Sequence, residues 1–348
     1  MPNEPTDPID TLFRTDPGEA VAREPPPIVE SPAMRSLYET AGRAADSPVN
    51  LIILGEPGVG KTTLARWIHA HSPRKRGPLV TIQCGGSYNA VESGLFGCMP
   101  RIFHRDQPGH PGVFEAAPDG TLVLEGVESL SLAPQAIMLR VIENRAVTRI
   151  GATRPVPVDV RIISTCAADL EGALHAREFR TDLFFRLNGL TLQIPPLRER
   201  QDDIEPLARH FLAGAATGGP APKLSGAVLD LFHSIVWPRN LDQLREVVTT
   251  AVERCTGSEI TPEHVDVEAL TNERLPAPAD HQIPVDDGHG PADLTDAERA
   301  ERARIIEALA DGNATRLAMR LGMARRTLIS KLDRYKIPRP RPPDVPKE

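Results

Sequence analysis

The sequence lacks the features of membrane and exported proteins. No apolar run approaches the roughly 18 residues that a membrane-spanning helix needs. Residues 1–30 are acidic and rich in proline, whereas a secretory signal is basic and then apolar. Cysteine is scarce, and its 4 residues have neither metal-ligand spacing nor the pattern of a disulfide framework. We therefore predict a cytoplasmic protein with reduced thiols and no membrane contact.

The chain also lacks an excess of positive charge. Its formal net charge is −7, which gives no overall attraction for nucleic acid or acidic lipid. Its 348 residues suit two or three domains, and a hydrophobic content of 40% is enough for a globular core. Proline-rich stretches mark the ends and joints. We predict a disordered leader over residues 1–30 and a linker over residues 271–292.

Apolar and helical segments alternate in the first half of the chain. The segments NLIIL, GPLVTIQC, GTLVLEG and VDVRIISTC indicate buried strands, and APQAIMLRVIEN indicates a helix. Ser31 and Pro32 suit the cap and first turn of another helix. Alternation of this kind is typical of a parallel sheet with crossover helices. We predict an α/β subdomain over residues 31–203 and a helical subdomain over residues 204–270.

A phosphate-binding loop is the clearest single motif. The segment GEPGVGKT fits the pattern G-x-x-x-x-G-K-[ST] and lies between an apolar strand and a helix. Glycines let backbone N–H groups surround phosphate, and the helix N-terminus adds positive potential. We expect Lys61 to reach the outer phosphates and Thr62 to hold Mg²⁺. The residues predicted to bind ATP or ADP are Gly55, Glu56, Pro57, Gly58, Val59, Gly60, Lys61, Thr62 and Thr63.

The last globular segment, residues 293–338, has the spacing of a helix-turn-helix domain. Gly322 suits the turn, and Leu328 and Leu332 place one apolar face on the helix that follows. That helix would enter the major groove of double-stranded DNA. Its polar face carries Arg325, Arg326, Thr327, Ser330, Lys331 and Arg334. The local excess of basic residues favours DNA contact over a solvated helical bundle, and a basic proline-rich tail follows at residues 339–348.

Several motifs in order carry a resemblance to a known family. They are SGLFG, GVFEAAPDGTLVLEG, FRTDLFFRLN, IPPLRER and WPRNLDQLREVV. Together with the phosphate loop, they resemble the AAA+ domain of bacterial enhancer-binding proteins, the activators of sigma-54 RNA polymerase, over roughly residues 28–270. The last domain resembles the Fis-type DNA-binding domain of that family. The family's usual N-terminal sensor domain has no counterpart among these motifs.

The resemblance implies a fold and partners. The fold would be an AAA+ parallel-sheet domain with a helical lid, followed by a small all-α helix-turn-helix domain. It implies binding of ATP with Mg²⁺, attachment to DNA, and assembly into a ring, with a dimer possible at rest. It also implies contact with sigma-54 RNA polymerase through a loop that reads Gly-Ala-Phe-Thr-Gly-Ala in the family. Here residues 101–106 read Arg-Ile-Phe-His-Arg-Asp, so only Phe103 matches, and we do not expect the usual sigma contact.

Three other positions depart from the family's catalytic pattern. The resemblance places Glu125 in the Mg²⁺ shell, but Gly126 stands where the family has its catalytic glutamate and cannot take a proton. Ala167 replaces the polar residue that senses the terminal phosphate, and Asp242 replaces an arginine that touches nucleotide. Two alternatives stay open: Arg239 or Arg245 takes the place of the arginine missing at Asp242, and Glu128 serves as the base.

The arginine fingers of the family are retained. Arg180 and Arg186 match the residues that reach the terminal phosphate bound to a neighbouring subunit. Two hypotheses follow. In the first, the chain is a DNA-binding transcriptional regulator that binds ATP or ADP for assembly, with impaired hydrolysis and altered sigma contact. In the second, it is a fully active ATPase that remodels sigma-54 RNA polymerase from upstream DNA. We favour the first hypothesis, and whether the chain is an enzyme stays open.

Overall fold

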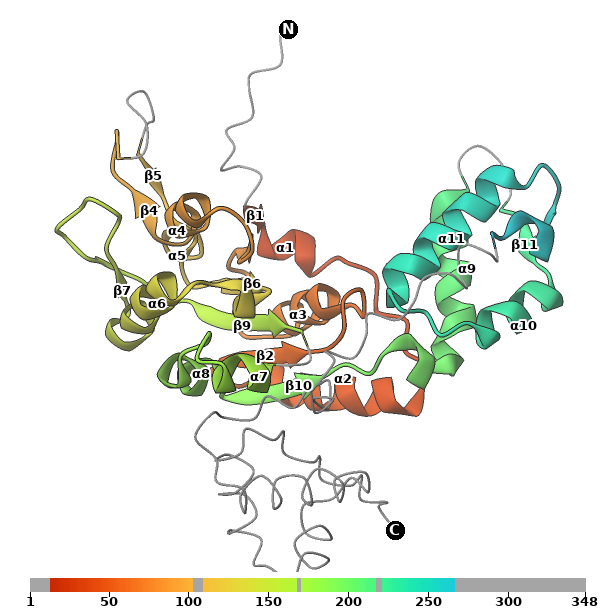
Figure 1. Cartoon of the computed structure of the whole chain (residues 1–348), viewed down its shortest axis with the longest axis horizontal. Coiled ribbons are helices and arrows are strands. Elements are labelled where there is room, and N and C mark those ends of the chain that lie inside the picture. Colours follow the sequence, from red (N-terminus) through yellow and green to blue (C-terminus); the bar gives the residue numbers. More distant parts are fainter. Residues whose placement is uncertain (1–12, 103–108, 168–169, 217–220, 267–348) are drawn as a thin grey trace, which may run out of the picture. The chain divides into compact units, whose positions relative to one another are not determined.

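The computed structural model describes residues 13–102, 109–167, 170–216 and 221–266, whose elements are labelled in Figure 1. The chain divides into two compact units, Met1–Glu273 and Arg274–Glu348. All of the described residues belong to the first unit. The predicted linker, helix-turn-helix domain and tail all begin after residue 266 and lie outside the described residues.

A six-stranded sheet with the strand order β1-β3-β6-β9-β2-β10 forms the centre of this unit. Five of the strands run parallel, and β1 pairs antiparallel with β3 at one edge. The strands are β1 (Phe13–Asp16), β2 (Leu51–Leu54), β3 (Leu79–Gln83), β6 (Thr121–Glu125), β9 (Arg161–Cys166) and β10 (Leu190–Gln193). The carboxyl ends of the parallel strands meet at one edge, where α/β proteins place ligands.

Alternating residues of the strands face two separate apolar layers, as the pleat of a β-strand requires. Leu51 and Ile53 face the layer covered by α2 (Pro32–Ala45) and α3 (Lys61–Ala70). Ile52 faces the opposite layer. The helices that follow in the chain are α4 (Tyr88–Phe96), α5 (Val113–Ala116), α6 (Leu132–Asn144), α7 (Leu170–His175) and α8 (Thr181–Leu187), with the 3-10 turn η1 at Val127–Ser129. The short strands β4 (Gly97–Cys98), β5 (His110–Pro111), β7 (Ala146–Val147) and β8 (Val156–Pro157) form two small antiparallel pairs.

A helical lid with its own core follows the sheet. Trp237 and Phe232 are fully buried in this core, and the Trp237 indole N–H donates to the Phe232 carbonyl at 2.9 Å. Its main helices are α9 (Ile204–Ala215), α10 (Gly226–Ser234) and α11 (Asn240–Arg254). Short pieces complete it: η2 (Leu197–Glu199), η3 (Gln201–Asp203), β11 (Lys223–Leu224), β12 (Glu259–Ile260) and η4 (Pro262–His264). The prediction of helices alone missed the parallel pair β11 and β12.

The prediction of a disordered leader over residues 1–30 is wrong for residues 13–30. These residues form β1, which occupies the open edge of β3, and the short helix α1 (Gly18–Val21). Val21 is fully buried, and Phe13 packs against the core of the sheet. An edge strand needs a backbone partner, and the leader supplies one here. Residues 1–12 lie outside the described residues.

Other local predictions are confirmed. The Ser31 hydroxyl caps α2 by accepting a hydrogen bond from the Met34 amide, and Pro32 opens the helix. The strands predicted around the phosphate loop are present as β2, β3, β6 and β9, and the predicted helix is α6. In the part of the chain that the structure describes, no helix has both the length and the apolar character needed to cross a membrane.

Candidate nucleotide site

The phosphate loop joins the end of β2 to the start of α3, as the sequence predicts. Gly58 and Gly60 adopt left-handed conformations, with φ values of 73° and 99°, that other residues rarely take. The Lys61 ammonium donates to the carbonyls of Gly55 and Glu56 at 2.7 and 2.9 Å. Burial lowers the pKa of Lys61, and the negative charge of Glu128 opposes this shift more strongly than any other charge. The Lys61 ammonium is therefore bonded to the backbone of its own loop.

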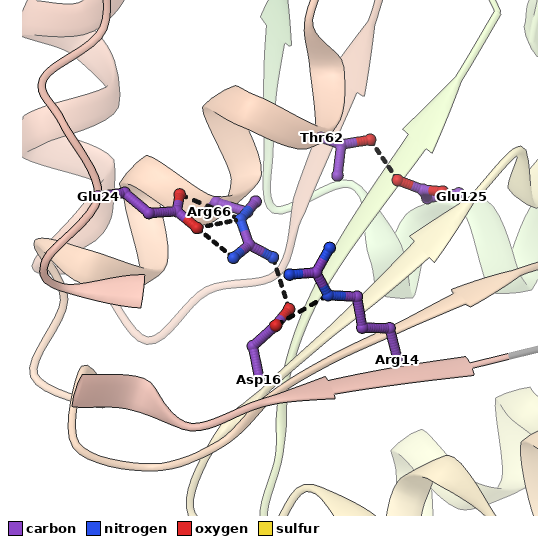
Figure 2. A network of polar contacts seen from close by, with 6 residues as sticks. All are labelled: Arg14, Asp16, Glu24, Thr62, Arg66 and Glu125. Atoms are coloured by element: carbon purple, nitrogen blue, oxygen red, sulfur yellow. Dashed lines mark hydrogen bonds and ion pairs between the residues drawn. The ribbon is translucent and has the colours of Figure 1, made fainter. Parts of the chain in front are cut away.

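The two predicted Mg²⁺ residues meet directly. The Thr62 hydroxyl, on the first turn of α3, donates to a carboxylate oxygen of Glu125 at the end of β6, as Figure 2 shows. The Gln83 side-chain amide, at the end of β3, donates to the other oxygen of Glu125. A hydroxyl beside a carboxylate is a suitable donor set for Mg²⁺ next to phosphate. The described residues hold no group of three His, Cys, Asp or Glu side chains that would form a metal cage of their own.

Two of the departures from the family pattern, Gly126 and Ala167, follow the ends of the neighbouring strands β6 and β9. Gly126 adopts a left-handed conformation with φ 67°, and the chain then folds back through η1. This turn places Glu128 beside the end of β9, where one of its carboxylate oxygens, Oε1, accepts a 2.8 Å hydrogen bond from the Ala167 amide. The other oxygen, Oε2, is buried and has no hydrogen-bond donor of normal geometry within the described part of the chain. Burial, and then the Glu128 charge, raise the pKa of the Cys166 thiol in the same place.

The lid is hydrogen-bonded to the phosphate loop through residues to which the sequence analysis gave no role. Arg198 donates two hydrogen bonds to the Glu56 carboxylate at 2.9 and 2.6 Å. The Asn240 amide donates to Glu56 and to the Pro57 carbonyl at 3.1 and 3.0 Å. Buried Arg200 donates to the Val59 carbonyl at 2.7 Å. The hydrogen bonds from Arg198, opposed by burial, hold the pKa of Glu56 below its ordinary value. The motifs IPPLRER and WPRNL contain these residues, but only the directions of their side chains show that they bind the phosphate loop.

Asp242 lies against the phosphate loop. One of its carboxylate oxygens is 2.9 Å from the point where a Cβ on Gly58 would stand. The neighbouring arginines are engaged elsewhere: Arg239 pairs with Glu246 at 2.7 Å, and Arg245 lies 4.9 Å over the Phe211 ring. An acid therefore lies beside the loop at the position where the resemblance expects an arginine.

The two predicted arginine fingers lie at the two ends of α8. Arg180 pairs with Asp182 at 2.7 Å, and Arg186 pairs with Glu143 at 3.0 Å. All four side chains are substantially exposed. Phe185 lies between the arginines in sequence and is 71% exposed, which is unusual for a large apolar side chain. This stretch of α8 is open to a neighbouring molecule.

The P-loop helix is also tied to the amino-terminal segment. Figure 2 shows Arg66 of α3 between Asp16 of β1 and Glu24, with Arg14 on the other side of Asp16. The Arg66 and Asp16 side chains are only 14% and 11% exposed. The sequence analysis missed this network because it treated the segment as a disordered leader.

Two sets of predicted site residues cannot be placed. Phe103, the one residue of the partner loop that matches the family, lies outside the described residues, between the paired strands β4 and β5. The predicted DNA-contacting residues of the helix-turn-helix domain also lie outside them.

Family models match most of the chain. Residues 28–193 match the Sigma-54 interaction domain, residues 198–281 match the AAA+ ATPase lid domain, and residues 297–335 match the Fis family of bacterial regulatory proteins. The order of the three matches is the order of the subdomains that the sequence predicts.

Individual proteins show the same relationship. The transcriptional regulatory protein ZraR of Klebsiella oxytoca is 36% identical over 312 residues, which cover 88% of this chain and 68% of ZraR. The sigma54-dependent transcriptional activator SfnR of Pseudomonas putida is 36% identical over 251 residues, covering 71% of this chain and 68% of SfnR. Crystal structures of NtrX from Brucella abortus in complex with ADP and with ATP each have a TM-score of 0.66 at 31% identity, covering 92% of this chain and 71% of NtrX.

Proposed function

Because the chain belongs to the family of sigma-54-dependent enhancer-binding proteins, we propose that it is a DNA-bound regulator for which ATP or ADP is chiefly an assembly ligand and hydrolysis is slow. The family combines an α/β AAA+ domain, a helical lid and a Fis-type helix-turn-helix, and so acts in transcription through nucleotide and DNA. With DNA and ATP as its partners, the protein would work in the cytoplasm.

The observation that carries this proposal is the contrast between an intact phosphate cradle and an altered catalytic edge. The positions of Lys61, Thr62 and Glu125 support binding of phosphate and Mg²⁺, and Mg²⁺ bound there would neutralise charge on the outer phosphates. At the next position Gly126 has no side chain to take a proton, and Ala167 has none to orient water. Loss of a general base typically lowers a rate by about 10²–10⁴-fold. Nucleotide structures of NtrX support the binding half of the proposal.

The altered partner loop supports a changed contact with sigma-54. The family's small residues and glycines are replaced by bulkier and charged ones around Phe103. Arg101, the first residue of the six, has a φ of 66°, a conformation that glycine takes without strain. A binding assay with sigma-54 and the ATP-bound protein tests this point. Binding that is lost on Phe103→Ala would overturn it.

A second function, the fully active sigma-54 activator, is favoured by Glu128. This carboxylate lies at the same edge of the sheet and could serve as a base. The two functions differ in turnover. The test is steady-state phosphate release by the full chain with Mg-ATP, with and without DNA, beside a nucleotide-binding titration. Binding with turnover near background supports the proposal. Turnover on the order of one per second, abolished by Arg180→Ala, supports the active motor.

A further inference from the structure

We propose that Glu128 is the general base for the ATP hydrolysis that this chain retains, in place of the missing acid at position 126. The inference rests on the nucleotide binding proposed above. It goes beyond that proposal because it assigns a catalytic residue to a position that the family's motifs leave without one.

The backbone places Glu128 at the reacting edge of the sheet. Gly126 takes the left-handed φ of 67° that opens the turn η1, and the Ser129 amide closes the turn on the Gly126 carbonyl at 2.9 Å. The turn carries residue 128 back over the carboxyl ends of β6 and β9. Gly126, which stands where the family has its catalytic acid, thus takes a backbone conformation that positions a different acid, Glu128.

The two oxygens of the Glu128 carboxylate differ in their hydrogen bonds. Its Oε1 atom is fixed by the 2.8 Å hydrogen bond from the Ala167 amide. The Cys166 thiol also hydrogen-bonds this carboxylate. Its Oε2 atom is buried and has no hydrogen-bond donor of normal geometry in the described ranges. A buried oxygen without a donor is costly, so such an atom calls for a functional explanation. A water molecule donating to Oε2 would supply the missing hydrogen bond and be the water to be activated.

The other acid at this edge is already engaged. Both oxygens of Glu125 accept hydrogen bonds, one from Thr62 and one from Gln83. Its place beside the phosphate-loop hydroxyl suits Mg²⁺. Glu128 is bonded instead to the Ala167 amide at the end of β9, outside the pair formed by Thr62 and Glu125.

The chemical step balances with water and ATP alone. Glu128 takes one proton from water while the water oxygen forms a bond to the terminal phosphorus. The bond between that phosphorus and the bridging oxygen of ADP breaks, its electron pair leaves with ADP, and inorganic phosphate is formed. The proton on Glu128 then passes to solvent or phosphate. The water has no polar side chain at Ala167 to orient it, which is consistent with slow turnover.

The test compares phosphate release and ATP affinity in the full chain. Glu128→Gln should lower phosphate release by about 10²-fold or more, as expected for loss of a base, while ATP affinity stays within about threefold. Glu39→Gln, an exposed acid on α2, is the matched control and should leave both values unchanged. A purely structural role for Glu128 would instead change ATP affinity or folding together with the rate.

A second variant separates a base from a structural acid. Adding Gly126→Glu to Glu128→Gln returns a carboxylate to the family's position, in a left-handed conformation that strains it, and should restore part of the lost rate. An unchanged rate in Glu128→Gln would overturn the inference, as would wild-type release no higher than that of Lys61→Ala. In that last case ATP would still bind and the proposed function would stand. Absence of ATP binding would overturn both. Fast turnover that Glu128→Gln abolishes would overturn only the proposed slow hydrolysis.

Discussion

The Leu241 amide donates a 2.9 Å hydrogen bond to the Gly58 carbonyl, so the first turn of α11 is attached directly to the phosphate loop. Gly58 tolerates this approach because it has no side chain: a Cβ would stand 2.3 Å from the Arg239 carbonyl oxygen. The lid and the loop therefore act as one unit. A change of charge on the first turn of α11 should therefore alter the electrostatic potential at the phosphate loop.

Removing the negative charge of Asp242 should strengthen ATP binding. Asp242 lies against Gly58, and a like charge a few ångströms from phosphate costs about 1 kcal/mol in a wet site. Asp242→Asn should therefore raise ATP affinity roughly fivefold, measured by titration calorimetry at low salt. Glu253→Gln, an exposed acid at the far end of the same helix, should leave the affinity unchanged. Equal or weaker binding by Asp242→Asn would show that the acid does not face the nucleotide.

Arg186 should matter for turnover but not for binding. Its guanidinium pairs with exposed Glu143, and the family resemblance assigns it to a neighbouring subunit's nucleotide. Arg186→Ala should keep ATP affinity and lower whatever phosphate release the assembled protein shows, by up to about 10³-fold. The control is Arg140→Ala, an exposed arginine on α6. If both variants behaved alike, Arg186 would be only a surface ion-pair partner.

Acid should destabilise the fold through His69. This residue of α3 is fully buried beside the Thr121 hydroxyl, and burial lowers its pKa from 6.5 to about 4. Below pH 6.5 the unfolded chain binds a proton that the folded chain rejects, so stability falls as the pH drops from 6.5 toward 4. The loss between pH 7 and pH 5 should be about 2 kcal/mol.

Urea unfolding at the two pH values checks this linkage. His69→Gln should lose this share of the pH dependence. His233→Gln, at an exposed position of α10, should keep it. An identical pH dependence in wild type and His69→Gln would mean that His69 binds a proton equally well in the folded and unfolded states.

The buried ion pair of the amino-terminal segment should stabilise the fold far more than an exposed pair. Asp16→Asn weakens the contacts with Arg66 and Arg14 and should cost about 1–3 kcal/mol at pH 7. Glu19→Gln breaks a pair whose side chains are both 82% exposed and should cost under about 0.5 kcal/mol. Chemical unfolding of both variants gives the comparison.

The pH dependence of this pair has a defined sign. Burial raises the pKa of Asp16, but hydrogen bonds from Arg66 and Arg14 outweigh it and hold the pKa below its ordinary value. The stabilisation is therefore present above the ordinary pKa and is lost as the pH falls through the lowered one. The difference between wild type and Asp16→Asn should shrink toward pH 3. A difference that grows in acid would contradict the assignment.

Much of the nucleotide site could be predicted from the sequence because local patterns encode it. The phosphate loop needs glycines at fixed positions and a strand and helix on either side, so its fold follows from a short segment. Thr62 and Glu125 come from distant segments, yet the family's motifs predicted their shared role and the structure places them in contact.

What could not be predicted depends on tertiary contacts. Residues 13–30 resemble a disordered segment in composition, and only the open edge of β3 makes Phe13–Asp16 a strand. The hydrogen bonds from Arg198 and Asn240 to Glu56 join residues far apart in sequence, and no spacing rule predicts them. Glu128 was named as an alternative acid, but its position over β9 depends on the left-handed turn at Gly126.

The pairing of β1 with β3 has a mechanical consequence. A pull along the chain that enters at Phe13 would load the backbone pairs from Phe13 to Asp16. Asp16 passes part of that load to Arg66, on the helix that begins with Lys61. Tension on the amino-terminal segment would thus be transmitted to the helix that follows the phosphate loop.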